Sequence, residues 1–166
     1  MINPSTLELF ADLSIGLIGF AGVVSALGRS RLHIDVRSFR IRALLFYSAA
    51  ALILSLVPIV AGNFELENYT VLALSTLTMV TAYLSILFWF GRTARPLTES
   101  GHLPIALARG LAGLGLLVIG MLVYGLVFAR IHLGSLYLVG LTWILMMGVF
   151  HFCMLVLSIQ LDDGGT

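Results

Sequence analysis

Five long apolar runs, separated by short polar breaks, constrain the fold of this chain more than any other feature. A helix that rises about 1.5 Å per residue needs about 20 residues to cross a hydrocarbon core of about 30 Å. The chain is 60% apolar and 10% charged, so it lacks the charged residues that a soluble domain uses to cover its surface. We therefore predict one all-α transmembrane domain over 1–166, a bundle of five helices at about 6–28, 38–62, 66–91, 104–130 and 135–161.

Proline and glycine mark several of the expected helix ends. Gly28 suits the end of the first helix, and Pro104 suits the first turn of the fourth. Pro58 falls inside the second run, where a membrane helix tolerates it if neighbouring helices satisfy the freed carbonyl. Glu8 and Asp12 make the first helix the weakest prediction, because acidic residues occupy its opening turns. A four-helix bundle with an interfacial first helix is the alternative.

Arginine is distributed unevenly among the breaks. The break after the first run is rich in arginine, whereas the break after the second run carries Glu65 and Glu67 and no basic residue. By the positive-inside rule, this asymmetry predicts an N-terminus outside and a C-terminus in the cytoplasm. A multi-pass protein of the bacterial inner membrane is the expected location. Lipid headgroups or a protein partner can contact Arg29, Arg31, Arg37, Arg40, Arg42 and Arg109. Setting the topology is a sufficient alternative role for the loop arginines, and Arg109 can instead extend its side chain to the headgroups.

The residue types that are missing exclude several chemistries. All nine basic residues are arginine, which excludes a Schiff-base lysine and a P-loop lysine. Cys153 is the single cysteine, which excludes internal disulfides, iron–sulfur clusters and thiolate zinc sites. The net charge of +1 indicates no nucleic-acid partner. We expect neither a cofactor nor a metal.

Two groups of polar residues are candidates for an ion pair or a polar path. Glu8 and Asp12 lie one helical turn apart, so they can bind a cation, pair with Arg130, or simply form a solvated helix start that suits the helix dipole. Hydroxyl side chains form a stripe along the third run. They can line a path in an oligomer or bond to a neighbouring helix or to their own carbonyls. This stripe contains Ser75, Thr78, Thr81 and Ser85.

His151 is the candidate for a pH-sensitive group. It lies on a helical stripe with Gly140, Ile144, Met147 and Ser158. It can shuttle a proton or sense pH, or it can be hydrogen-bonded to a neighbouring helix, which is the more common role. A bis-histidine haem site is not expected, because the other histidines fall in loops or at helix ends.

Glycines recur at helical spacing in the first and fourth runs. Small residues let membrane helices approach closely, because packing rather than hydrophobicity drives their association. We therefore expect these two helices to pack tightly against another helix, either within the subunit or across an oligomer. The predicted packing positions are Gly16, Gly19 and Gly22 in the first run, and Gly110, Gly113 and Gly120 in the fourth.

Three classes of function are compatible with this pattern. A non-enzymatic subunit that self-associates, or packs into a larger membrane complex, is favoured by the glycine patterns and the uncharged middle of the membrane. A homo-oligomeric channel or small carrier is the alternative, in which the polar stripes line the path. A membrane enzyme acting on lipid or peptide is the third class, and it lacks a convergent nucleophile and base. Membrane lipids and a second copy or another membrane protein are the expected partners.

Overall fold

The computed structural model describes residues 2–27, 34–64, 67–99, 105–128 and 132–163. These residues form five α-helices, and each contains a span of 19 to 28 residues that is long and apolar enough to cross a membrane. The prediction of a five-helix membrane bundle is confirmed, and the first helix is one of the five. The helices are α1 (Pro4–Leu27), α2 (Ile34–Gly62), α3 (Asn68–Glu99), α4 (Ile105–Val127) and α5 (Leu133–Asp163).

Two of the observed helix ends differ from the predicted ones by more than three residues. α2 begins at Ile34, so Arg37, Arg40 and Arg42 belong to its first turns. α3 continues through Gly91 and ends at Glu99. Glycine is a permissive helix end but not an obligatory one, and both helices extend where arginine side chains can reach the water at the end of the bundle.

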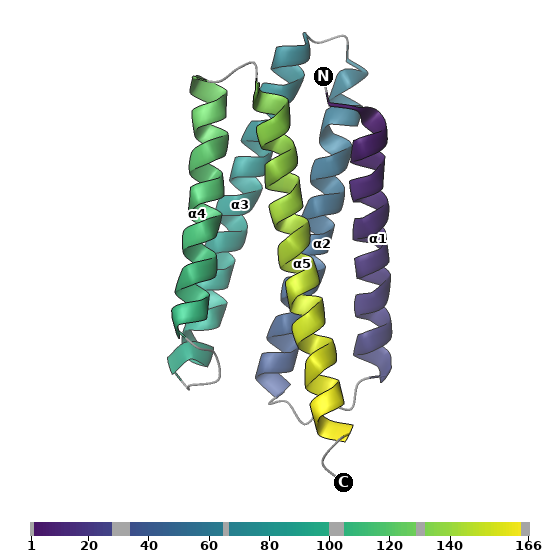
Figure 1. Ribbon diagram of the computed structural model, residues 1–166, viewed down its shortest axis with the longest axis vertical. Helices are drawn as coiled ribbons and strands as arrows, with labels where there is room; N and C mark the ends of the chain where they lie inside the picture. Colours follow the sequence, from purple (N-terminus) through teal and green to yellow (C-terminus); the bar gives the residue numbers. More distant parts are fainter. Residues whose placement is uncertain (1, 28–33, 65–66, 100–104, 129–131, 164–166) are drawn as a thin grey trace.

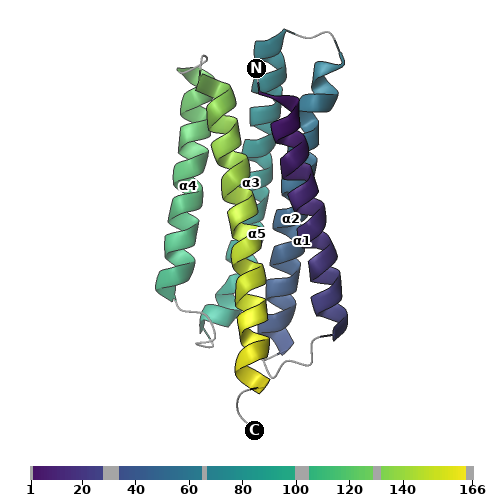
Figure 2. The same cartoon turned by 45° about the vertical axis from the view of Figure 1, so that its right-hand side comes forward.

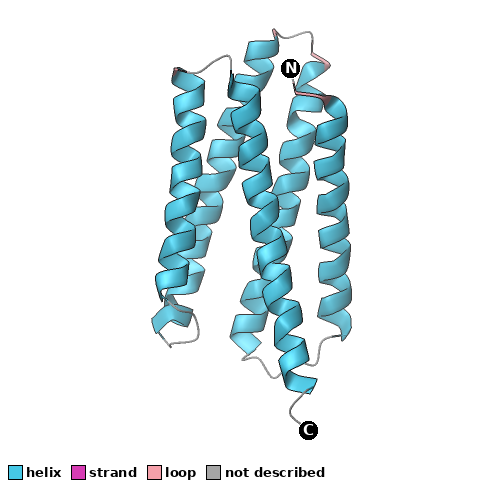
Figure 3. Cartoon of the chain, viewed as in Figure 1, coloured by secondary structure: helices cyan, strands magenta, loops and turns pink. Residues whose placement is uncertain are grey.

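Successive helices run in opposite directions, and all five lie side by side (Figures 1 and 3). α2 and α5 pack along each other in the middle, α1 covers both on one side, and α4 packs on α3 and α5 on the other. Figures 1 and 2 both place α1 and α4 at opposite sides of the bundle. The two outer helices therefore have long faces that no other helix of the bundle covers.

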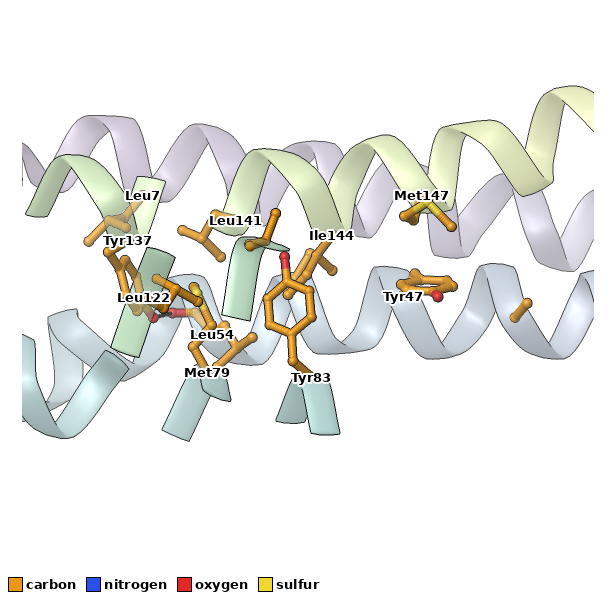
Figure 4. Packing of buried hydrophobic residues seen from close by; sticks show 13 residues of the cluster. Leu7, Tyr47, Leu54, Met79, Tyr83, Leu122, Tyr137, Leu141, Ile144 and Met147 are labelled. Atoms are coloured by element: carbon orange, nitrogen blue, oxygen red, sulfur yellow. Dashed lines mark hydrogen bonds between the residues drawn. The ribbon is translucent and has the colours of Figure 1, made fainter. Parts of the chain in front are cut away.

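The core lies where α5 meets α2, α3 and α4. Figure 4 shows Met79 and Tyr83 of α3 reaching toward Leu141 and Ile144 of α5. A Cβ added to Gly140 would lie 2.5 Å from Met79 Sδ. This glycine therefore lets α5 approach α3 more closely than any larger residue would.

Pro58 leaves one carbonyl of α2 without its helical donor, and the core supplies a replacement. Proline has no N–H, so the carbonyl four residues earlier, that of Leu54, lacks its usual partner. The buried Tyr137 hydroxyl of α5 donates a hydrogen bond to this oxygen. A membrane helix tolerates a proline when a neighbour satisfies the freed carbonyl, and here a side chain of α5 does so.

Candidate functional site

His151 is the centre of a buried aromatic cluster at the arginine-rich end of the bundle. The residue is 4% exposed, and its Nε2 atom has no hydrogen-bond partner among the described residues. Tyr47 stacks on the imidazole, with ring centroids 5.7 Å apart and an angle of 16° between the planes. Three phenylalanines lie around it at centroid distances of 6.1, 6.3 and 5.6 Å, namely Phe39, Phe90 and Phe150.

Two arginines of α2 reach inward beside this cluster instead of pointing into water. Arg40 Nη1 donates to the Met154 carbonyl of α5 at 2.8 Å. Arg37 Nη2 donates to the Val24 carbonyl at 3.5 Å. The carbonyls in the last turn of α1 lack helical donors, so Arg37 caps that helix end. These side chains therefore tie α2 to α5 and α1.

A second unpartnered polar atom lies one residue from Tyr47. Ser48 is fully buried, and its Oγ has no hydrogen-bond partner among the described residues. A Cβ added to Gly148 would lie 3.4 Å from this oxygen, so the hydroxyl faces α5. An unsatisfied hydroxyl in a low-dielectric interior destabilises the folded state.

A small cavity lies on the other side of Tyr47, between α2, α3, α4 and α5. Its volume is about 30 Å³, which is the share of one or two water molecules. Tyr47, Tyr83 and Trp143 supply polar atoms to its wall. The Tyr83 hydroxyl donates to the Gly140 carbonyl at 2.8 Å. This space fits water and not a substrate.

These residues do not assemble a recognisable catalytic or metal site. His, Cys, Asp and Glu form no group of three or more that could hold a metal ion within the described ranges. Cys153 is exposed, two residues from the buried His151. The cluster is a buried packing centre in which two polar atoms, His151 Nε2 and Ser48 Oγ, have no hydrogen-bond partner among the described residues. Four residues of the helical stripe noted in the sequence, Gly140, Ile144, Met147 and His151, are buried, while the aromatic partners from α2 and α3 gave no signal in the sequence.

The acidic candidates lie on the outer face of α1. Glu8 and Asp12 are both exposed on the isolated bundle. Arg130, the predicted partner of Asp12, lies outside the described residues. The ion pair therefore stays a prediction.

The hydroxyl stripe of α3 is bonded within its own helix. Ser75 is buried, while Thr78, Thr81 and Ser85 are exposed. Each donates to the carbonyl four residues earlier, at distances of 2.7 to 2.9 Å. Of the two packing roles that the sequence left open, this geometry matches bonding to the helix's own carbonyls.

Within the part of the chain that the structure describes, none of the six predicted packing glycines closely approaches another helix. No described atom of another helix lies within 4 Å of a Cβ added to Gly16, Gly19, Gly22, Gly110, Gly113 or Gly120. All six are exposed. The close approaches occur at other glycines, where an added Cβ would lie within 3.4 Å of a side chain: Gly125, Gly134, Gly140 and Gly148.

The predicted lipid-contacting arginines divide into three sets. Arg42 and Arg109 are exposed at the same end of the bundle. The guanidinium groups of Arg37 and Arg40 donate hydrogen bonds to helix carbonyls, as described above. Arg29 and Arg31 lie outside the described residues.

Comparison of the chain with protein-family models, with curated proteins and with solved structures gave no match in any of the three searches. The functional proposal is therefore argued from the arrangement of the described residues.

Proposed function

We propose that this protein is a non-enzymatic membrane subunit that associates side by side with further copies of itself through the outer faces of α1 and α4. One observation supports this above all: the six regularly spaced glycines of these helices point away from the bundle. Glycine inside a helix is less favourable than alanine by about 1 kcal/mol. In a membrane it is compensated where a second helix packs closely against it.

The two outer faces can be compared at a common level, because contacts tie the start of α1 to the end of α4. A Cβ added to Gly134 of α5 would lie 3.3 Å from Ile2 Cγ1. A Cβ added to Gly125 of α4 would lie 3.4 Å from Leu133 Cδ1 of α5. The first residues of α1 and the last residues of α4 therefore lie at one end of the bundle, as Figure 1 also shows.

Two glycines of each face lie at similar depths when residues are counted from Pro4 on α1 and from Val127 on α4. At about 1.5 Å per residue, Gly19 and Gly113 lie roughly 21 to 23 Å deep, and Gly22 and Gly110 roughly 25 to 27 Å deep, whereas Gly16 and Gly120, at roughly 18 and 10 Å, do not pair. α1 and α4 run in opposite directions. Two copies inserted in the same orientation can therefore pack α1 of one against α4 of the next as an antiparallel pair, glycine against glycine.

The acidic residues of α1 add to this argument. Carboxylates within a membrane-spanning helix are costly when they face lipid, and they usually face protein or water instead. Glu8 lies roughly 6 Å below the start of α1, and Tyr124, which is 60% exposed on α4, lies about 4 Å from the same level. In the proposed pair, the Tyr124 hydroxyl of one copy can donate a hydrogen bond to the carboxylate of its neighbour.

Particle mass in native nanodiscs tests the proposal. We expect particles of the unmodified protein to contain two or more copies of the chain. Particles of Gly19→Leu or Gly113→Leu should contain one copy, because the leucine side chain keeps the two helices apart. Thr81→Leu is the matched control, since Thr81 is a small exposed residue at a similar depth on α3. A monomeric unmodified protein, or glycine variants of unchanged mass, would contradict self-association. A stoichiometric foreign chain would assign the faces to a partner.

A homo-oligomeric channel is the second candidate, and the exposed Glu8 and Asp12 favour it. Carboxylates that face water in the centre of an assembly avoid the cost of facing lipid. Conductance in planar bilayers distinguishes the two functions. A channel would pass current that Asp12→Asn alters, whereas a packing subunit would assemble and stay silent.

A further inference from the structure

A groove of about 390 Å³ lies between α2 and α3 on the outer surface of the bundle. Small side chains in its middle leave the space open: Ala49 and Ala50 on α2 and Ala82 on α3. Ile53 and Thr78 line one end, and Phe46 and Trp89 line the other. This space is about thirteen times that of the small cavity beside Tyr47.

The lining is apolar although it contains two hydroxyl groups. Thr78 Oγ1 and Ser85 Oγ donate to the carbonyls of Leu74 and Thr81, each at 2.9 Å. Their donors are therefore already used, and the groove offers little to a polar ligand. Its walls match a hydrocarbon chain.

The groove has the length of a chain in one leaflet. Phe46 and Ile53 are about 11 Å apart along α2, and Thr78 and Trp89 about 17 Å apart along α3, at 1.5 Å per residue. Half of a hydrocarbon core is about 15 Å thick. The Phe46 and Trp89 rings pack together with centroids 4.8 Å apart and form the end of the groove. Tryptophan is typical of the interface with the headgroups.

Positive charge lies beyond this aromatic end. Arg42 precedes Phe46 by one helical turn, on the same face of α2, and it is exposed. Arg92 follows Trp89 by three residues on α3, is also exposed, and its guanidinium lies 5.4 Å from the centre of the Phe88 ring. The two arginines make this end of the groove complementary to an anionic headgroup.

We propose that the groove between α2 and α3 binds an anionic phospholipid, with one acyl chain between Phe46 and Ile53 and the phosphate at Arg42 and Arg92. The site is independent of the proposed self-association, because it uses neither α1 nor α4. Such a site would make the protein prefer acidic lipids at this one position. The general attraction of arginine to an acidic membrane surface would not select any single position.

Trp89 provides a direct reporter of this lipid. The chain has two tryptophans, so Trp143→Phe leaves Trp89 as the single tryptophan, which is excited selectively over the tyrosines. The variant is placed in vesicles in which phosphatidylcholine is progressively replaced by phospholipid with a brominated acyl chain, because bromine quenches tryptophan on contact. We expect brominated phosphatidylglycerol to reach half-maximal quenching at a several-fold lower mole fraction than brominated phosphatidylcholine.

Single substitutions test which residues produce the preference for phosphatidylglycerol. Arg42→Gln and Arg92→Gln should each weaken the preference for phosphatidylglycerol, roughly five-fold at most, in line with the attraction of one arginine to an anionic lipid surface. Arg109→Gln is the matched control, because Arg109 is exposed at the same end of the bundle on α4. Ala50→Phe should fill the groove and reduce quenching by both lipids.

The proposal fails if both brominated lipids quench equally, or if the preference survives in the Arg42→Gln/Arg92→Gln double variant. It also fails if Ala50→Phe changes particle mass but not quenching, since the groove would then hold a second copy. Native mass spectrometry of the unmodified protein is a check that needs no variant. Retained phosphatidylglycerol supports the site, and exchange of every lipid at the same rate contradicts it.

Discussion

The glycines of this protein occupy two contrasting environments. On α5, a Cβ added to Gly140 or Gly148 would meet a side chain from another helix within 3.4 Å. On α1 and α4, a Cβ added to Gly19, Gly113 or Gly120 would meet no described atom of another helix within 4 Å. The same residue type therefore allows close helix packing within the bundle in one region and contributes no such packing in the other. The outer glycines are accounted for if another molecule packs against them.

The largest effect expected from this contrast is on the free energy of unfolding. Gly140→Leu should destabilise the protein by about 3 kcal/mol, because the new side chain overlaps Met79 and Leu122 in a packed core. Gly120→Leu, at a similar depth on α4, should not destabilise the monomer and should raise its stability by up to about 1 kcal/mol, because leucine is the better helix former. Unfolding by SDS titration in detergent that keeps the protein monomeric measures both. Equal losses in the two variants would remove the distinction between the regions.

The tyrosine that completes the core should show the next largest effect. Tyr137→Phe leaves the Leu54 carbonyl beside Pro58 without a donor, so we expect a loss of about 2 kcal/mol. Tyr83→Phe should cost less, about 0.6 kcal/mol, because its acceptor is a carbonyl of an uninterrupted helix.

Restoring the helical donor tests the cause of that effect. In a Pro58→Ala background, α2 can bond to its own Leu54 carbonyl, and Tyr137→Phe should then cost no more than Tyr83→Phe. An unchanged loss in that background would show that the tyrosine acts through packing instead of through the orphaned carbonyl.

The smallest expected effect concerns a polar atom in the core that has no partner. Ser48→Ala should raise the free energy of unfolding by about 0.5 kcal/mol, because it removes a buried hydroxyl without a hydrogen bond. Ser75→Ala is the control, since Ser75 is equally buried but bonded to its own helix at 2.7 Å. A loss of stability in Ser48→Ala would mean that this hydroxyl is satisfied in the membrane, for instance by a buried water.

Apolar length alone predicted the number of helices and approximately where they lie. The position of Pro58 within the second run also predicted that a neighbouring helix must supply a hydrogen-bond donor, because a proline in a membrane helix always leaves one carbonyl without its helical donor. The sequence did not indicate Tyr137 as that donor, since the pairing depends on how α5 is rotated against α2. The same rotation decides which glycines face the core, and spacing within one helix carries no information about it.

Only part of the candidate site could be predicted, because the rest depends on how the helices are rotated against one another. The sequence placed Gly140, Ile144, Met147 and His151 on one stripe of α5, because periodicity within one helix suffices for that, and the structure shows that this stripe is buried. The aromatic ring of partners around His151 comes from several helices, and single-helix patterns do not report on contacts between them. The groove at Phe46 and Trp89 likewise exists only because small residues of two helices meet, Ala49 and Ala50 of α2 and Ala82 of α3.

Disulfide cross-linking tests the central claim, that the outer glycines serve association between copies, most directly. In a Cys153→Ser background, protein carrying Gly22→Cys is co-expressed with protein carrying Gly110→Cys, and native membranes are oxidised. Cysteines at closely packed glycines fall within the Cα separation of about 4.4–6.8 Å that a disulfide allows. We predict a cross-linked dimer from the mixed pair and none from either variant alone. No cross-link in the mixed pair, or equal cross-linking in each variant alone, would contradict the proposed packing of α1 against α4.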